Sequence, residues 1–247
     1  MSEGTAKTVS SMIESADSDA PVYKLEDLQR YYTTKAEVVK AVNGINLEIK
    51  PGEFIAILGP SGSGKTTLLN LLAGLDKPTG GKLLFKGQNM ATLSDNQLCD
   101  LRRYDIGIIF QFYNLHPSFT ALENIEYPMM IANIPKERRR EVSLELIGLM
   151  GLEDKKDNFP AELSGGERQR IGIARSLAND PTVIIADEPT GDLDSDNAIS
   201  IIRLLNRINK EQGKTIVMVT HDDSLLEKHM RVVQIVDGMI SEFINNR

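Results

Sequence analysis

Residues 59–66 have the types and the spacing of a loop that binds phosphate. The segment reads GPSGSGKT and matches G-x-x-x-x-G-K-[ST]. Glycines at three of these positions allow backbone conformations that a side chain would forbid, so main-chain N–H groups can surround phosphate oxygens. Lys65 supplies positive charge for the β- and γ-phosphates, and the Thr66 hydroxyl suits Mg²⁺. We predict that this loop binds a nucleoside triphosphate through Gly59, Pro60, Ser61, Gly62, Ser63, Gly64, Lys65, Thr66 and Thr67.

The flanks of this loop support the same prediction. An apolar run at 54–58 precedes it, and a helical pattern of leucines at 68, 69, 71 and 72 follows. A strand, a loop and a helix in this order are the structural context that the motif requires. An ordinary turn rich in glycine and serine would not need every fixed position of the motif to be filled.

Two adjacent carboxylates end another apolar run, VIIADE at 183–188. Asp187, at the carboxyl end of this predicted strand, can hold Mg²⁺ through its water shell. Glu188 can polarise a water molecule aimed at the γ-phosphate. Two such acids could also form a plain surface pair, but the apolar run before them and the phosphate loop upstream argue against that reading.

The segment LSGGERQR at 163–170 begins a predicted helix. Ser164 and Glu167 have the spacing of a capping box. A capping box does not explain two glycines in the first turn, where glycine disfavours a helix. A helix start with a serine and small neighbours is, however, a good phosphate site.

In their order and spacing, GPSGSGKT, LSGGERQR and VIIADE resemble the ABC-type ATPases, the nucleotide-binding subunits of ABC transporters. The resemblance runs from about Tyr23 to the C-terminus, and the LSGGE-type motif is its specific part. FQFYNLHPSFTALENIEYP and ADEPTGDLDS resemble the macrolide-exporter and lipoprotein-release branch, which also contains the cell-division ATPase. Members of that branch often have Asn where this chain has Asp192, so the chain departs from the pattern of the branch at this position.

The resemblance implies roles for further residues. Gln111 is similar to the Q-loop glutamine, which contacts Mg²⁺ and the attacking water and senses the membrane partner. His221 resembles the switch histidine, and Tyr32 resembles the aromatic residue that stacks on adenine, although Tyr31 next to it leaves the register open. The implied catalytic residues are Glu188, His221 and Gln111, and the Mg²⁺ residues are Thr66, Gln111 and Asp187. The implied residues facing a second subunit's ATP are those of the LSGGE-type motif, Ser164, Gly165, Gly166 and Glu167. GDLD at 191–194 resembles the D-loop, which adds Asp194 to the nucleotide-binding residues.

The elements that must position these residues predict an α/β fold. Three apolar runs, at 106–110, 183–186 and 215–220, are typical of parallel strands buried on both faces. Helical patterns lie at about 136–150, 165–178 and 195–212. With the resemblance, this predicts a P-loop NTPase of ABC type: a mainly parallel core sheet, an N-terminal antiparallel β subdomain, and a helical subdomain inserted at about 112–163. Residues 1–21 are expected to be a disordered tail, and 22–247 the ATPase domain.

The composition narrows the classes of function. The 247 residues carry a net charge of −7, which disfavours a general nucleic-acid surface. The single cysteine, Cys99, excludes an intrachain disulfide, and we expect it to be a small buried hydrophobe. No apolar run approaches the roughly 20 residues of a membrane helix. The run KERRRE at 136–141 is read as the solvated face of a helix.

The resemblance implies an ATPase that uses ATP and Mg²⁺ and dimerises head to tail with a second copy of itself. It would drive a separate integral membrane permease-type subunit from the cytoplasmic face of the cell membrane, with no nucleic-acid partner. One alternative is an ATPase of the same branch that regulates an extracytoplasmic process mechanically, without transporting a substrate. Another is a soluble ABC ATPase acting on ribosomes or DNA, which usually carries tandem domains or long coiled-coil insertions. A third alternative is a P-loop kinase or GTPase, and the LSGGE motif argues against this class.

Overall fold

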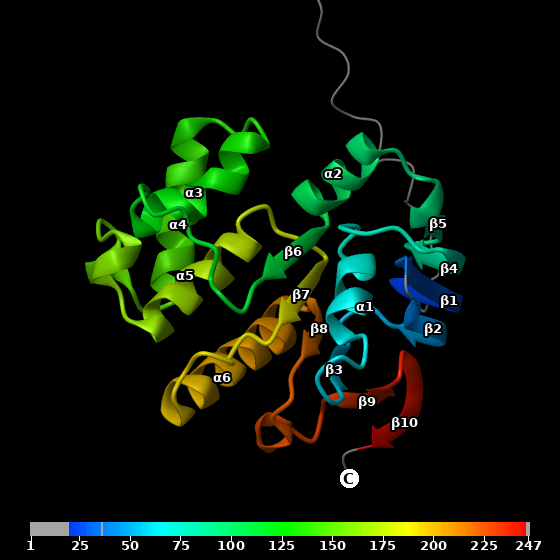
Figure 1. Ribbon diagram of the computed structural model, residues 1–247. Helices are drawn as coiled ribbons and strands as arrows, with labels where there is room; N and C mark the ends of the chain where they lie inside the picture. Colours follow the sequence, from blue (N-terminus) through cyan, green and yellow to red (C-terminus); the bar gives the residue numbers. More distant parts are fainter. Residues whose placement is uncertain (1–19, 36, 246–247) are drawn as a thin grey trace, which may run out of the picture.

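The structure, a computed structural model, describes residues 20–35 and 37–245, with side-chain burial described through residue 242. Residues 1–19 of the predicted disordered tail therefore lie outside the described residues. Within the described part, two sheets and six α-helices form the fold (Figure 1).

The larger sheet has six strands in the order β10-β9-β3-β8-β7-β6. The strands from β9 to β6 are parallel, and β10 is antiparallel to β9. This confirms the prediction of a mainly parallel core sheet. The strands are β3 (Phe54–Leu58), β6 (Ile106–Ile109), β7 (Val183–Asp187), β8 (Thr215–Val219), β9 (Arg231–Val236) and β10 (Met239–Asn245).

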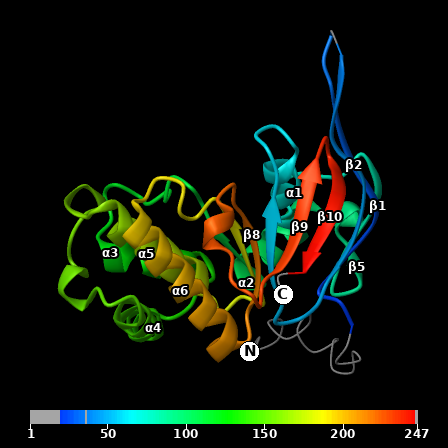
Figure 2. The same cartoon turned by 90° about the horizontal axis from the view of Figure 1, so that it is seen from below.

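The smaller sheet is antiparallel and has the order β2-β1-β4-β5. Its strands β1 and β2 form a long hairpin that projects from the molecule (Figure 2). The N–H of Asn43 in this hairpin donates to the Gly238 carbonyl between β9 and β10, which joins the two sheets. The strands are β1 (Tyr23–Thr33), β2 (Val38–Ile49), β4 (Gly80–Phe85) and β5 (Gln88–Asn89).

Both faces of the larger sheet are covered, and its strands alternate between two apolar cores. In β3, Ala56 packs in the core shared with α5 and α6, whereas Ile57 packs in the core shared with α1 and the smaller sheet. Burial on both faces explains why these strands are continuous apolar runs rather than alternating ones. The α-helices are α1 (Lys65–Leu72), α2 (Asp95–Tyr104), α3 (Ala121–Ile131), α4 (Lys136–Leu149), α5 (Gly165–Leu177) and α6 (Ser195–Gln212).

Helices α3, α4 and α5 lie between β6 and β7 in the chain and form the left-hand part of Figure 1, together with η3 (Glu153–Lys155) and η4 (Pro160–Glu162). The sequence did not separate α3 from its surroundings, because Pro128 lies inside it and proline normally interrupts a helix. The other short helices are η2 (Met90–Thr92) and η5 (Asp223–Leu225). None of the helices in the described ranges is long and apolar enough to cross a membrane.

The expectation for Cys99 was wrong, because its side chain is exposed. Its neighbour Leu98 is the buried residue of α2, and one step along a helix turns the next side chain away from the core. The Cys99 sulfur lies 3.0 Å from Nη2 of Arg102.

Strand β6 and helix α5 approach each other closely at Gly107, which gives a test of this packing. A Cβ at Gly107 would lie 2.4 Å from the main-chain oxygen of Ser176. We expect Gly107→Ala to destabilise the protein by about 1–3 kcal/mol, which lowers Tm by roughly 2–4 °C for each kcal/mol. Gly148→Ala is the control, because a Cβ there meets only Glu153, at 3.5 Å, and alanine favours a helix. Equal melting temperatures for the two variants would contradict this packing.

Candidate functional site

A cavity of about 830 Å³ opens beside the phosphate loop. It is lined by loop residues and by Glu188 and His221, so the structure brings two predicted catalytic residues to the predicted phosphate site. Its other walls carry no motif and were not predicted from the sequence. They come from β2 and from the turn between β9 and β10: Val38, Val39, Lys40, Ala41, Asn43, Asp237, Gly238 and Met239.

The phosphate loop is held between two neighbouring strands by close backbone contacts. A Cβ at Gly64 would lie 1.9 Å from the Ala41 carbonyl oxygen of β2, and one at Gly59 would lie 2.2 Å from the Ile235 carbonyl oxygen of β9. Gly64 also has a φ of 100° at the N-cap of α1. These contacts leave no room for a side chain, which explains why the loop needs glycine at both positions.

The charged group of the loop is already engaged with the loop itself. Lys65 is 6% exposed, and its Nζ donates to the carbonyls of Gly59 and Pro60, both at 2.8 Å. Close by, the buried Oγ of Ser63 has no hydrogen-bond partner among the described residues. A buried ammonium and an unpaired hydroxyl fit a ligand that is rich in acceptor oxygens, as a triphosphate is.

Asp187 and Thr66 come together at the carboxyl end of β7. Burial raises the pKa of the Asp187 carboxyl, and the charge of Glu188 raises it further, while Lys65 and a hydrogen bond from Thr66 oppose the shift. No cluster of three metal-binding side chains exists among residues 20–35 and 37–245. A carboxylate and a hydroxyl without such a cluster fit Mg²⁺, which is usually bound by one or two carboxylates together with substrate phosphates and water.

Glu188 is held in an unusual conformation. Its φ of 43° lies in the left-handed region, and its N–H donates to Val219 in β8. The carboxylate Oε2 of Glu188 lies 3.2 Å from Nδ1 of His221. Strain of this kind in a residue that is not glycine is common where a side chain must be aimed at a reaction.

Gln111 lies close to Glu188 without lining the cavity. A Cβ on Gly191 would be 3.1 Å from Nε2 of Gln111 and 3.4 Å from Oε2 of Glu188. The two polar groups therefore face the same small space beside Gly191. The structure thus places the three residues predicted to be catalytic close together: Glu188, His221 and Gln111.

Neither tyrosine proposed for adenine lines the cavity. The Tyr32 hydroxyl donates to Asp76 at 2.7 Å, and the Arg30 guanidinium lies 4.5 Å from the centre of the Tyr32 ring. The Tyr31 hydroxyl donates to Asn43, also at 2.7 Å. Tyr32 as the adenine residue therefore stays a prediction.

The start of α5 forms the capping box that the sequence predicts. The Ser164 N–H donates to Glu167 at 2.7 Å, and the Glu167 N–H donates to Oγ of Ser164. Gly166 packs against α6, because a Cβ there would lie 2.5 Å from Oδ1 of Asn197. Asp194 caps α6 by accepting from the N–H of the same Asn197.

The N-termini of α5 and α6 therefore lie side by side, joined by Asn197, which no sequence motif pointed to. Residues 164–167 and Asp194 do not line the cavity at the phosphate loop of the same chain. The predicted phosphate-binding residues thus form two separate groups in one copy of the protein.

The raised pKa of Asp187 predicts a conflict between the site and the stability of the fold. A carboxyl with a raised pKa weakens the folded state where it is ionised, so Asp187→Asn should raise the Tm of the nucleotide-free protein at pH 7–8. A gain of about 1 kcal/mol corresponds to roughly 2–4 °C for a domain of this size. The gain should shrink as the pH falls and Asp187 of the wild type becomes protonated. Thermal melts at several pH values test this, and a variant that is less stable than the wild type at pH 7–8 would contradict it.

Comparisons with known proteins agree on one family. Residues 42–191 match the family described as ABC transporter. The chain is 44% identical to an uncharacterised ABC transporter ATP-binding protein of Thermotoga maritima, over 89% of this chain and 93% of that protein. It is 42% identical to a lipoprotein-releasing system ATP-binding protein of Rhodopseudomonas palustris, over 90% and 99% of the two chains.

A third relative is longer than this chain. The macrolide export ATP-binding/permease protein of Hyphomonas neptunium is 43% identical over 92% of this chain but only 35% of its own length. Among solved structures, a dimeric ATP-binding cassette of Methanocaldococcus jannaschii bound to ADP and Pi has a TM-score of 0.84 at 41% identity, over 91% of this chain and 99% of that one.

Proposed function

The chain belongs to the ABC transporter family as an ATP-binding and ATP-hydrolysing subunit, and we propose that residues 22–247 are an ATPase domain that drives a membrane permease. The observation that supports this best is that Glu188 and His221 line the cavity at the phosphate loop, with Gln111 close to Glu188 beside Gly191.

Phosphate binding exchanges the partners of Lys65. The lysine leaves the Gly59 and Pro60 carbonyls for the β- and γ-phosphates, and Ser63 gains an acceptor for its hydroxyl. Thr66, Asp187 and Gln111 would hold Mg²⁺. When bound, the metal ion supplies positive charge that stabilises the transferring phosphoryl group.

Glu188 is the proposed general base. It accepts a proton from the attacking water, and His221 at 3.2 Å holds the carboxylate in position and contacts the γ-phosphate. Gln111, close to Glu188 beside Gly191, orients the water. The strained conformation of Glu188, directly after the end of β7, supports this assignment.

A second copy of the chain would bring the two separate groups of phosphate-binding residues together in one ATP site. Each ATP would lie between the phosphate loop of one subunit and Ser164, Gly165, Gly166, Glu167 and Asp194 of the other, in a head-to-tail dimer. The N-terminus of α5 adds favourable potential for the γ-phosphate. The relative of known structure that binds ADP and Pi is a dimer, which agrees with this arrangement.

Two variants test the shared site. Glu188→Gln should bind Mg-ATP and hydrolyse it about 10²–10⁴-fold more slowly, so that gel filtration with Mg-ATP shows a stable dimer. Ser164→Arg should bind ATP as a monomer with nearly normal affinity, because its own phosphate loop is intact. The arginine side chain fills the space between the subunits. The variant should therefore neither dimerise in Mg-ATP nor hydrolyse ATP.

The control for this pair is the double variant Glu188→Gln with Ser164→Arg, which should remain monomeric in Mg-ATP. Normal hydrolysis by Ser164→Arg would rule out the shared site. A wild-type rate per subunit that does not change where sedimentation shows only monomer would rule it out as well.

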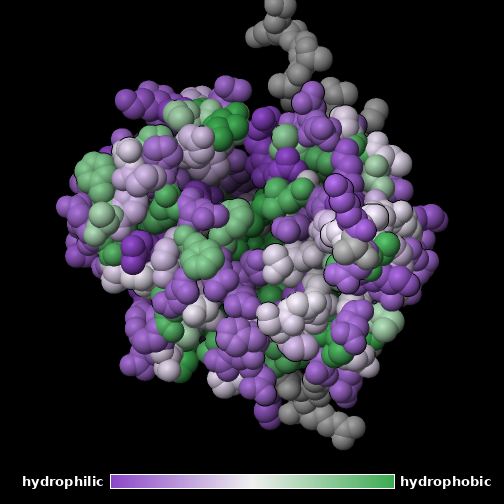
Figure 3. Space-filling view, in the orientation of Figure 1, coloured by the Kyte–Doolittle hydropathy of each residue, from purple (hydrophilic) through white to green (hydrophobic). Residues whose placement is uncertain are grey.

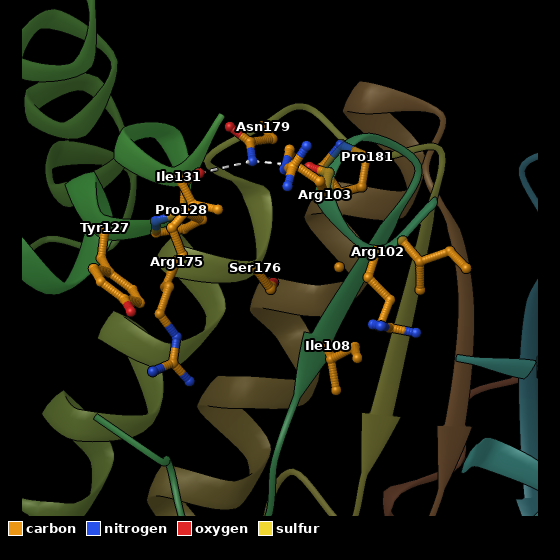
Figure 4. Close-up of a pocket in the computed structure, with 12 residues that line it drawn as sticks. Arg102, Arg103, Ile108, Tyr127, Pro128, Ile131, Arg175, Ser176, Asn179 and Pro181 are labelled. Carbon is orange, nitrogen blue, oxygen red and sulfur yellow. Dashed lines mark hydrogen bonds between the residues drawn. The ribbon is translucent and has the colours of Figure 1, made fainter. Parts of the chain in front are cut away.

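A groove between α2, β6, α3 and α5 is the proposed docking site of the permease. The surface is hollowed there, with apolar residues on its floor (Figure 3). Figure 4 shows Tyr127, Pro128 and Ile131 of α3 opposite Ile108 of β6, with Arg102, Arg103 and Arg175 around them. Tyr127 and Ile131 are 40% and 47% exposed, which is high for such side chains.

The proposed occupant is a short helix of the permease with apolar residues and at least one carboxylate. Within the part of the chain that the structure describes, the groove is lined by three arginines and by no acidic residue, so an acidic segment complements its charge. The longer relative named ATP-binding/permease carries both parts in one chain, and this chain matches about a third of it. The ATPase would then lie on the cytoplasmic face of the membrane beside a permease of the macrolide-export and lipoprotein-release branch.

Ile131→Glu tests the groove. The charge should repel the acidic, apolar segment, so the fraction of the protein recovered with washed membranes should fall about tenfold, while the basal ATPase rate stays within about twofold. Leu144→Glu is the matched control, because Leu144 is 42% exposed on α4 and does not line the groove. Equal membrane recovery of the two variants would exclude the groove as the docking site.

A further inference from the structure

The loop that follows Gln111 contains two consecutive residues in a left-handed conformation. Tyr113 has a φ of 58° and Asn114 a φ of 49°. This conformation is unfavourable for residues other than glycine, and more so for a bulky aromatic residue than for asparagine. Such strain persists only where surrounding contacts hold the backbone.

Arg175 of α5 provides these contacts. Its Nη2 donates to the Tyr113 carbonyl at 2.7 Å, and its Nη1 donates to the Asn114 carbonyl at 2.5 Å. One guanidinium thus binds both strained peptide units, which a planar fork can do and a single ammonium cannot.

The charge of Arg175 has no acidic partner in the described part of the chain. No salt bridge involves it there, and burial lowers the pKa of its guanidinium. Desolvating a cation without a counter-charge is unfavourable, so hydrogen bonds must compensate for it. The two carbonyls of the loop accept the hydrogen bonds that Arg175 makes with the described residues.

The same loop touches both halves of the proposed ATP site. At one end, Gln111 lies beside Gly191 and Glu188. At the other, the Tyr113 hydroxyl is the nearest atom to a Cβ built on Gly165, at 3.1 Å, and the Tyr113 ring lies 5.3 Å from the Arg168 guanidinium. Gly165 opens α5, whose first turn faces the ATP of the second subunit in the proposed dimer.

We propose that Arg175 is a positioning residue for ATP hydrolysis, which acts by holding Tyr113 and Asn114 in their left-handed conformation. Held in this way, the loop keeps Gln111 beside Glu188 and keeps Tyr113 against the start of α5. The inference rests on the proposed function, because it acts through the role assigned to Gln111. Arg175 also lines the groove, where it extends away from Asn179, so a docked segment would meet it directly (Figure 4).

Arg175→Lys keeps the positive charge and removes the planar guanidinium that donates to both carbonyls. The kcat for ATP should fall about 10–100-fold, because small misplacements of an orienting group have effects of that size. The affinity of the monomer for ATP should change less than twofold, since the phosphate loop is untouched. Arg139→Lys is the matched control: Arg139 is also half-buried and donates to a carbonyl, that of Ile134, away from the site.

Rescue by glycine separates this role from simple packing. Asn114→Gly removes the cost of the left-handed conformation at one of the two positions, so it should raise the kcat of Arg175→Lys at least threefold. Ser118→Gly in the same background is the control, because Ser118 lies in the same connection and does not have a positive φ. Arg175→Gln provides a second background in case Arg175→Lys folds poorly.

Rescue by Asn114→Gly but not by Ser118→Gly supports the proposal. A wild-type kcat in both Arg175 variants overturns it, and so does a loss of kcat that neither glycine restores or that both restore equally. Gln111→Ala is measured beside them. If Gln111→Ala is slow and Asn114→Gly gives no rescue, the proposed function stands and the role of Arg175 fails. If Gln111→Ala hydrolyses ATP normally, the assignment of Gln111 fails instead.

Discussion

The ATP site depends on main chains that approach too closely for any side chain. Gly59 packs on the Ile235 carbonyl of β9, and Gly64 packs on the Ala41 carbonyl of β2. Two further main-chain hydrogen bonds complete this contact: Gly238 N–H donates to Ser63, and Asn43 N–H donates to Gly238. The phosphate loop is thus bound to both sheets through one turn, which explains why a nucleotide site in the larger sheet needs the smaller one beside it.

The parts of the fold that local patterns control could be predicted from the sequence. The periodicity at 195–212 coincides with α6, and the apolar runs at 183–186 and 215–220 fall within or overlap β7 and β8. Helix α3 was not separated, because Pro128 normally signals an interruption and the protein tolerates it near the end of the helix. Cys99 was placed on the wrong side of α2, since a single small residue carries too little hydrophobicity to fix which face is buried.

The residues of the candidate site differ in the same way: some are indicated by local sequence patterns, and others only by contacts with residues distant in the sequence. Residues 59–67 and 187–188 could be predicted as site residues because the motifs that indicate them are runs of consecutive residues. Asn43, Gly238 and Asn197 could not, because each matters only through a contact with a residue distant in the sequence or across a helix pair. The fold does not distinguish Tyr31 from Tyr32 either, because neither residue lines the cavity and both hydroxyls donate to protein acceptors, Asn43 and Asp76.

The hydrogen bonds of Lys65 have a consequence for how fast nucleotide exchanges. The Gly59 and Pro60 carbonyls can accept the hydrogen bonds of the Lys65 ammonium, so binding a phosphate gains only the difference between two sets of partners. The departure of ADP leaves no unpaired buried cation, because the carbonyls are in place to receive the lysine again. The loop therefore gives up some affinity for nucleotide and in return lowers the barrier to product release, a step that a machine working in cycles must repeat as often as it hydrolyses ATP.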